Sequence, residues 1–121
     1  MTKDQRRLQE AMIYYPRLRR VRDYVEHNYS DDISLCEAAR IAHLEEKYFS
    51  TYFHRKTGIC FKAWLAQVRI GHAKSMMEQE NCSITEVAFA VGFRDLRTFE
   101  RSFKRYTDMT PRAFKNSVRP S

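Results

Sequence analysis

Apolar residues recur along this chain at the spacing of amphipathic helices, in blocks separated by short polar breaks. The longest block begins at Phe61, and its period of about 3.6 residues predicts a helix over residues 61–80. An earlier block follows Pro16, a residue that suits the first turn of a helix. Residues 1–16 allow either a further helix or a tail. With only three Gly and three Pro, the pattern predicts an all-α protein.

One pattern of residues occurs twice. The segment that begins at Ser34 aligns with the segment that begins at Ser83, with one residue added in the second copy between its two halves. In each copy a serine is followed three residues later by a glutamate, which predicts a capping box at the start of a helix. The matching pairs are Ser34 and Ser83, Glu37 and Glu86, Ala39 and Ala88, Phe49 and Phe99, Phe53 and Phe103, Thr57 and Thr107, and Trp64 and Phe114.

A short break follows the first helix of each copy, at His43 and at Gly92. Glycine adopts a left-handed backbone without strain, whereas histidine tolerates it less well. The next helix begins after Asp95 in the second copy, a good N-cap residue, and after Glu45 in the first, a poorer one. Two helices joined by a tight turn fit a helix-turn-helix, although a generic helical hairpin has the same outline.

The second helix of the second copy has two unlike faces. At about 100° per residue, Phe99, Phe103 and Tyr106 share one side and four cations share the other. The aromatic side is expected to be buried. The cationic side is either an ordinary solvated face or a surface for an anionic partner, because arginine can pair with guanine and with phosphates. Its cations are Arg97, Arg101, Lys104 and Arg105.

The first copy has a less basic counterpart of this helix. Its expected buried side is formed by Tyr48, Phe49, Tyr52 and Phe53. Serine and threonine on its outer side can bond to bases or phosphates, so they read sequence weakly. The outer side carries Lys47, Ser50, Thr51, His54 and Arg55.

The chain has a formal net charge of +7, from 22 Lys and Arg against 15 Asp and Glu, and the excess is largest towards the C-terminal end. Such a charge favours a polyanionic partner, although it also serves solubility. The three cysteines, Cys36, Cys60 and Cys82, are far apart, which argues against a zinc site or a disulfide framework and fits a reducing cytosol.

Other function classes find little support. No apolar run is long enough for a membrane span, and the N-terminus has no signal-peptide core, so a cytoplasmic protein is expected. No catalytic set, phosphate-binding glycine loop or metal-ligand spacing is present, so we expect neither an enzyme nor a cofactor. Cys60 is expected to be a buried packing residue and Trp64 a core anchor.

The motifs from about Leu18 to Arg119 resemble the DNA-binding module of the AraC/XylS transcription regulators. The residues that carry the resemblance are "SLCEAARIA", "YFSTYFHRKTGICFKAWLAQVRIGHAKSMM", "SITEVAFAVGF" and "TFERSFKRYTDMTPRAF". It implies an all-α fold of about seven helices, with two helix-turn-helix subdomains joined by a long linker helix. The expected divisions are residues 1–16 for a tail or extra helix, 17–60 and 81–121 for the two helix-turn-helix units, and 61–80 for the linker.

The resemblance also implies site residues. The second helices of the two units are expected to enter successive major-groove segments of double-stranded DNA. The residues implied for base contacts are Lys47, Ser50, Thr51, Leu96, Arg97, Glu100 and Arg101. Those implied for phosphate contacts are Ser34, His54, Arg55, Lys56, Ser83, Lys104 and Arg105.

The sequence departs from the family pattern at two places. Asp108 stands where the second unit usually has glycine, and a left-handed aspartate costs about 1 kcal/mol. Arg97 and Thr98 replace a more usual Ser-Tyr pair, which leaves the base assignments there open. No effector-binding domain is visible, so the chain resembles either the small stand-alone members or a fragment of a larger regulator.

The sequence therefore predicts a sequence-specific transcription regulator that binds an asymmetric DNA site as a monomer. The family mostly activates, which favours an activator and implies contact with RNA polymerase. Two alternatives stay open: a non-specific architectural DNA binder, and a basic module that docks on an acidic protein partner.

Overall fold

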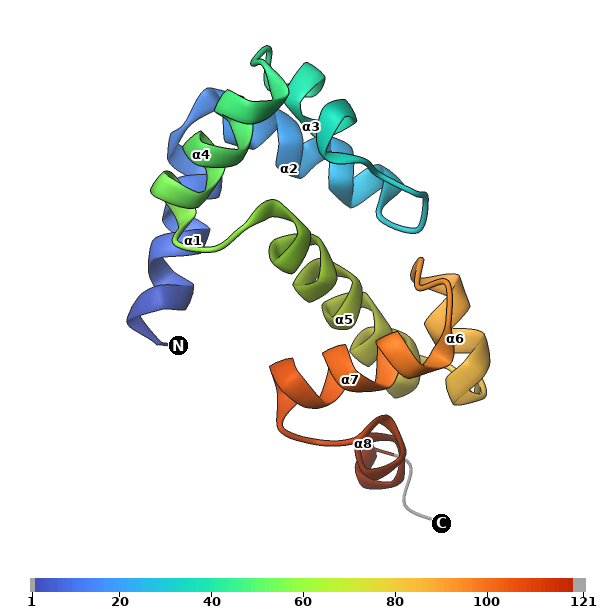
Figure 1. Cartoon of the computed structure of the whole chain (residues 1–121). Helices are drawn as coiled ribbons and strands as arrows, with labels where there is room; N and C mark the ends of the chain where they lie inside the picture. The colour runs from blue at the N-terminus through green and yellow to red at the C-terminus, as the bar shows by residue number, and fades with distance from the viewer. Residues whose placement is uncertain (1, 119–121) are drawn as a thin grey trace. The chain divides into compact units, whose positions relative to one another are not determined.

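A computed structural model of the chain describes residues 2–118 and divides the protein into two compact units, one up to Leu65 and one from Ala66 onward (Figure 1). Eight helices and no strand are found among the described residues, close to the number that the sequence predicted. The helices are α1 (Lys3–Tyr14), α2 (Pro16–Asn28), α3 (Leu35–Ile41), α4 (Glu46–Thr57), α5 (Phe61–Gln79), α6 (Ile84–Ala90), α7 (Leu96–Thr107) and α8 (Pro111–Val118). Helix α1 decides the alternative left open for residues 1–16 in favour of a helix.

Unit 1 contains α1 to α4 and the first residues of α5. Its core combines the apolar stripe of α2, including Leu18 and Val25, with Phe49 and Phe53 of α4. Both phenylalanines contact Phe61, and Phe53 also contacts Trp64, at ring-centroid separations of 5.7–5.8 Å. Such aromatic contacts favour edge-to-face and tilted geometries. Trp64 is 6% exposed, which confirms its predicted role as a core anchor.

Unit 2 contains the remainder of α5 together with α6, α7 and α8. Its aromatic core follows the same plan, with Phe99 and Phe103 of α7 fully buried. Phe93 lies 5.3 Å from Phe99, and Phe114 of α8 lies 5.5 Å from Phe103, between ring centroids. In both units, the Phe pair on the predicted aromatic side of the second helix packs inward.

In each unit, a threonine at the matching position ends the second helix. The Thr57 hydroxyl lies within hydrogen-bond distance of two carbonyl oxygens, at 2.8 Å from Phe53 and 3.0 Å from Ile59, and it accepts from the Ile59 N–H. Thr107 makes the same three contacts with Phe103 and Met109. One hydroxyl therefore connects the last turn of the helix to the residue two positions beyond it.

A residue in the left-handed conformation follows each threonine. Gly58 has a φ of 86° and Asp108 a φ of 62°, so the aspartate does adopt the backbone that glycine usually supplies. At the break between the two helices of each unit, His43 has a φ of 60° and Gly92 a φ of 108°. The histidine is therefore strained, as its sequence position suggested.

The helix starts are capped unequally. The Ser83 hydroxyl accepts from the Glu86 N–H and the Glu86 carboxylate accepts from the Ser83 N–H, so the predicted capping box of unit 2 forms completely. In unit 1 the Ser34 hydroxyl accepts from the Glu37 N–H at 3.0 Å. The carboxylate of Glu37, however, accepts from the Tyr24 hydroxyl of α2 and not from the Ser34 backbone. That prediction is half right, because α2 offers a competing donor.

Asp95 caps α7 with both of its oxygens. One accepts from the Thr98 N–H at 2.7 Å and the other from the Thr98 hydroxyl at 2.9 Å. These two bonds lower the pKa of the Asp95 carboxyl, and the positive charges of Arg101 and Arg97 act in the same direction. Glu45, at the same place before α4, makes no side-chain capping bond, as expected of a poorer cap.

Two further predictions about burial are wrong. Tyr48 is 61% exposed, because it lies at the edge of the apolar stripe of α4 and Phe49 and Phe53 fill the core. Cys60 is also exposed, since the buried stripe of α5 begins with the next residue, Phe61.

Among residues 2–118, no helix is both long and apolar enough to cross a membrane.

We expect Thr57→Val to lower the free energy of unfolding by about 1–3 kcal/mol, because it leaves the Ile59 N–H without its partner in a partly buried site. Urea unfolding followed by circular dichroism measures this. The matched change Thr107→Val should cost less, since Thr107 is only half-buried. A Thr57→Val protein as stable as the wild type would contradict this role of the hydroxyl.

The lowered pKa of Asp95 predicts a dependence of stability on pH. The stabilisation is present above the carboxyl's ordinary pKa of about 4 and is lost as the pH falls through the lower folded-state value. In Asp95→Asn the side chain can still cap the helix but no longer titrates. Thermal unfolding from pH 6 to about pH 2.5 should therefore decline less steeply for the variant. Equal slopes for the two proteins would refute the assignment.

Candidate nucleic-acid interface

The second helix of unit 2, α7, presents a polar face opposite its buried rings. Arg97, Glu100 and Arg101 are exposed on this face, and Leu96 is half-buried beside them. Because Phe99 and Phe103 are fully buried, the helix cannot rotate to hide its cations without opening the core. The four residues implied for base contacts in unit 2 therefore lie on the accessible part of α7.

Two cations at the end of α7 are also exposed but are already engaged. The Lys104 ammonium donates to the Asp108 carbonyl at 3.1 Å, which places a positive charge at the helix C-terminus. The Arg105 guanidinium lies 5.8 Å from the centre of the Tyr106 ring. Arg101 and Arg105 border one shallow hollow of about 240 Å³ together with Thr98, Ser102 and Tyr106.

The second helix of unit 1, α4, gathers its implied base-contacting residues in a single hollow. Lys47, Ser50 and Thr51 are all exposed and line a cavity of about 570 Å³. Glu45 and Glu46 line the same cavity, so its charge is mixed where the face of α7 is mainly cationic. His54 and Arg55 extend the exposed side of α4 towards its C-terminal end.

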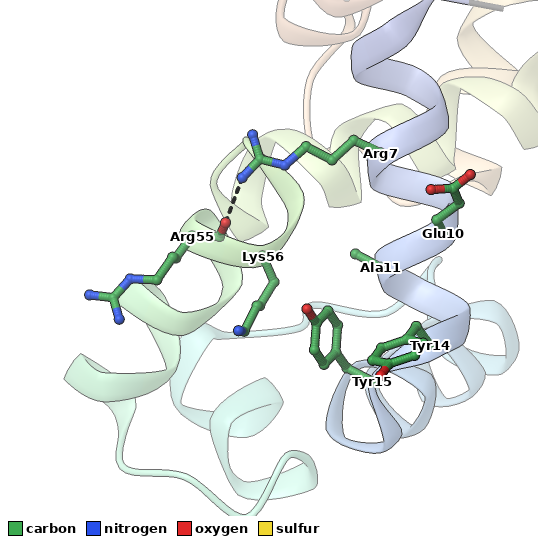
Figure 2. A pocket seen from close by; sticks show the side chains of 7 residues that line it. All are labelled: Arg7, Glu10, Ala11, Tyr14, Tyr15, Arg55 and Lys56. Atoms are coloured by element: carbon green, nitrogen blue, oxygen red, sulfur yellow. Dashed lines mark hydrogen bonds between the residues drawn. The ribbon is translucent and has the colours of Figure 1, made fainter.

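Lys56 is placed differently from the other implied phosphate contacts. It is half-buried, and its ammonium lies 4.8 Å from the centre of the Tyr15 ring and 5.7 Å from that of Tyr52. These are cation–π distances. Figure 2 shows Lys56 turned towards Tyr15, whereas Arg55 extends away from α1. Desolvation by burial raises the pKa of the Tyr52 hydroxyl.

The two serines implied for phosphate contacts cap the first helices of the units. Ser34 and Ser83 are exposed, and each hydroxyl oxygen already accepts a backbone N–H. Each serine can therefore still donate its hydroxyl proton to another acceptor.

Sequence reasoning missed two arginines that hold the helices of unit 1. Arg7 of α1 donates to the Arg55 carbonyl at 2.6 Å (Figure 2). Arg17 of α2 donates to the Ala42 carbonyl at 2.9 Å, at the turn that leads into α4. Both contacts join residues far apart along the chain, and no periodicity or motif in the sequence connects them.

A cavity of about 420 Å³ lies between α1 and the end of α4 (Figure 2). It is lined by Arg7, Glu10, Ala11, Tyr14, Tyr15, Arg55 and Lys56. Among residues 2–118, His, Cys, Asp and Glu form no group of three or more that could hold a metal ion.

Comparison with known proteins identifies the family. A family model described as a helix-turn-helix domain matches residues 38–117. The Bacillus subtilis protein YobQ, named as an uncharacterized HTH-type transcriptional regulator, is 30% identical over 95 residues. That match covers 78% of this chain but only 39% of YobQ, so the chain spans about two fifths of the length of this relative.

Solved structures share the fold. The C-terminal domain of the response regulator yesN from Fusobacterium nucleatum matches with a TM-score of 0.72 and 29% identity, covering 78% of this chain and 93% of that one. An AraC-type DNA-binding regulator from Chromobacterium violaceum matches with a TM-score of 0.78 and 20% identity, covering 88% and 96%. The DNA-binding domain of AdpA, solved in complex with a target DNA, matches with a TM-score of 0.75 and 24% identity, covering 84% and 94%.

The family model spans both second helices and most of the chain, and the solved structures share the fold. The chain therefore belongs to the AraC-type helix-turn-helix family of transcriptional regulators.

Proposed function

We propose that this chain binds a specific site on double-stranded DNA and regulates transcription there, with α4 and α7 as its recognition helices. The observation that carries the proposal is the pairing of one scaffold with two different polar faces. Both recognition helices bury a Phe pair in the same manner, yet α7 exposes Glu100 and Arg101 where α4 exposes Ser50 and Thr51. The AdpA domain, which has the same fold, was solved on its target DNA.

The face of α7 suits direct reading of bases in the major groove. The guanidinium groups of Arg97 and Arg101 can each donate two hydrogen bonds to a guanine, and the Glu100 carboxylate can accept from a cytosine amino group. Leu96 can contact a thymine methyl group. Lys104 and Arg105, one turn further along the helix, are suited to backbone phosphates.

The face of α4 suits a weaker contribution. Lys47 can donate to guanine, and the hydroxyls of Ser50 and Thr51 bond to several bases with little discrimination. His54 and Arg55 supply phosphate contacts, and the hydroxyls of Ser34 and Ser83 supply two more at the helix starts. Lys56 reaches a phosphate only if it leaves the rings of Tyr15 and Tyr52.

Because the two faces differ, the proposed site is asymmetric and needs no two-fold partner. One chain binding as a monomer would place its recognition helices in major-groove segments about one helical turn, or roughly 34 Å, apart. We further propose that the regulator activates transcription, which requires a contact with RNA polymerase.

The test is selection of bound sequences from a random DNA library, followed by a salt titration on the selected site. We expect two short blocks about ten base pairs apart from centre to centre. The logarithm of affinity should fall with the logarithm of salt concentration, with a slope of about −0.9 for each neutralised phosphate. Salt-dependent binding without sequence preference would indicate an architectural DNA binder. Weak binding that salt does not change would favour an acidic protein partner.

The two recognition helices should contribute unequally. Arg101→Ala should weaken binding to the selected site by about 10- to 100-fold, the range for loss of a bidentate arginine–guanine contact. Thr51→Ala should weaken it by less than about fivefold, because a hydroxyl makes a single contact. Gel-shift or fluorescence-anisotropy titrations measure both, with Arg20→Ala on the exposed side of α2 as a charge-matched control. Equal losses for Arg101→Ala and Thr51→Ala would refute the proposed asymmetry.

A further inference from the structure

The last turn of α4 is held by a side chain from α1. The Arg7 Nη2 donates to the Arg55 carbonyl at 2.6 Å, one of the carbonyls that the helix itself leaves without a partner (Figure 2). The same guanidinium lies close to the left-handed Gly58, where a Cβ atom would approach its Nη1 to 3.2 Å. Glycine at position 58 therefore both ends α4 and leaves room for Arg7.

The turn before α4 is held in the same manner by α2. The Arg17 Nη1 donates to the Ala42 carbonyl at 2.9 Å and lies 3.4 Å from the carbonyl of His43, the residue with the positive φ. The turn before α4 and the last turn of α4 are thus held by arginines of α2 and α1, not by residues of α3 or α4.

The recognition helix of unit 2 has side-chain hydrogen bonds from residues at both of its own ends. Asp95 caps the start of α7 with two hydrogen bonds, and Lys104 donates to the Asp108 carbonyl at its end. The start of α4 has no such side-chain cap, since Glu45 makes none. Two side chains that hold the backbone at α4 therefore come from α1 and α2.

We infer that Arg7 is a positioning residue for base reading by α4, which makes α1 part of the DNA-reading apparatus of unit 1. The inference rests on the proposed function. It also concerns a helix that precedes residues 38–117, the range that the family model matches.

If Arg7 instead bound a DNA phosphate, the dependence of affinity on salt would be different. Arg7 lines the cavity of about 420 Å³ with Arg55 and Lys56, so a phosphate could in principle lie among these three cations. A phosphate contact would add about −0.9 to the slope of the logarithm of affinity against the logarithm of salt. A positioning residue bonded to a backbone carbonyl adds nothing to that slope, and its loss reduces discrimination between bases.

The experiment compares Arg7→Met with Arg6→Met in the full chain. Arg6 is the adjacent exposed arginine on α1, so both variants lose one charge and keep a helix-favouring residue. Each protein is titrated with the selected duplex, with a duplex whose unit 1 block is scrambled, and with one whose unit 2 block is scrambled. The Thr51→Ala variant shows which block unit 1 reads. Scrambling that block weakens DNA binding by Thr51→Ala less than it weakens binding by the wild type.

We expect Arg7→Met to reduce discrimination at the unit 1 block by about fivefold, the fold-change of a typical net hydrogen bond. Discrimination at the unit 2 block and the salt slope should stay at their wild-type values, and Arg6→Met should match the wild type in all three. Equal loss at both blocks, a reduced salt slope, or identical behaviour of the two variants would each overturn the inference. A wild-type protein that discriminates at neither block would refute the proposed function and this inference with it.

Hydrogen exchange of the free protein gives a second readout that needs no DNA. The Gly58 N–H donates to the His54 carbonyl at 2.8 Å and closes the last turn of α4. Its exchange should be about fivefold faster in Arg7→Met than in Arg6→Met. Equal exchange in the two variants would show that Arg7 does not hold this turn.

Discussion

Burial of a phenylalanine pair in the second helix of each unit is the constraint on which the rest of this structure depends. Phe49 and Phe53 in α4, and Phe99 and Phe103 in α7, have no exposed surface. A helix anchored by two rings one turn apart has only one orientation about its axis that keeps both of them in the core. The residues on its opposite side are then presented to solvent whatever they are. The outer face can therefore vary between the two copies while the scaffold stays the same.

The ends of these helices are fixed by a second set of interactions, and here the two units differ. Thr57 and Thr107 make the same three backbone contacts, so the C-terminal ends of α4 and α7 are held in the same way. The helix starts are not duplicated: Asp95 caps α7 with its side chain, whereas Arg17 of α2 holds the turn before α4. Arg7 of α1 bonds at the other end of α4. Unit 2 is the one whose recognition helix has a side-chain cap and the more cationic face.

Much of this organisation could be predicted from the sequence because it is carried by local patterns. The repeat, the serine caps, the Asp95 cap and the buried Phe pairs all follow from residue type at helical spacing. The left-handed Asp108 could also be anticipated, since its matching residue is Gly58. Tyr48 and Cys60 were assigned to the core wrongly because each sits beside a stripe whose neighbours already fill the space. Contacts between distant segments carry no such signal. Nothing in the sequence connects Arg7 with Arg55, or Tyr24 with the Glu37 carboxylate that the Ser34 cap was expected to hold.

The most direct test of the account is a backbone amide NMR titration of the ¹⁵N-labelled chain with its selected duplex. The account predicts that the largest chemical-shift changes fall on the N-terminal halves of α4 and α7, around Lys47 to Thr51 and Leu96 to Arg101, while the amides of Phe53 and Phe103 change little. Changes confined to the outer surfaces of α2 and α8, with α4 and α7 unaffected, would contradict it.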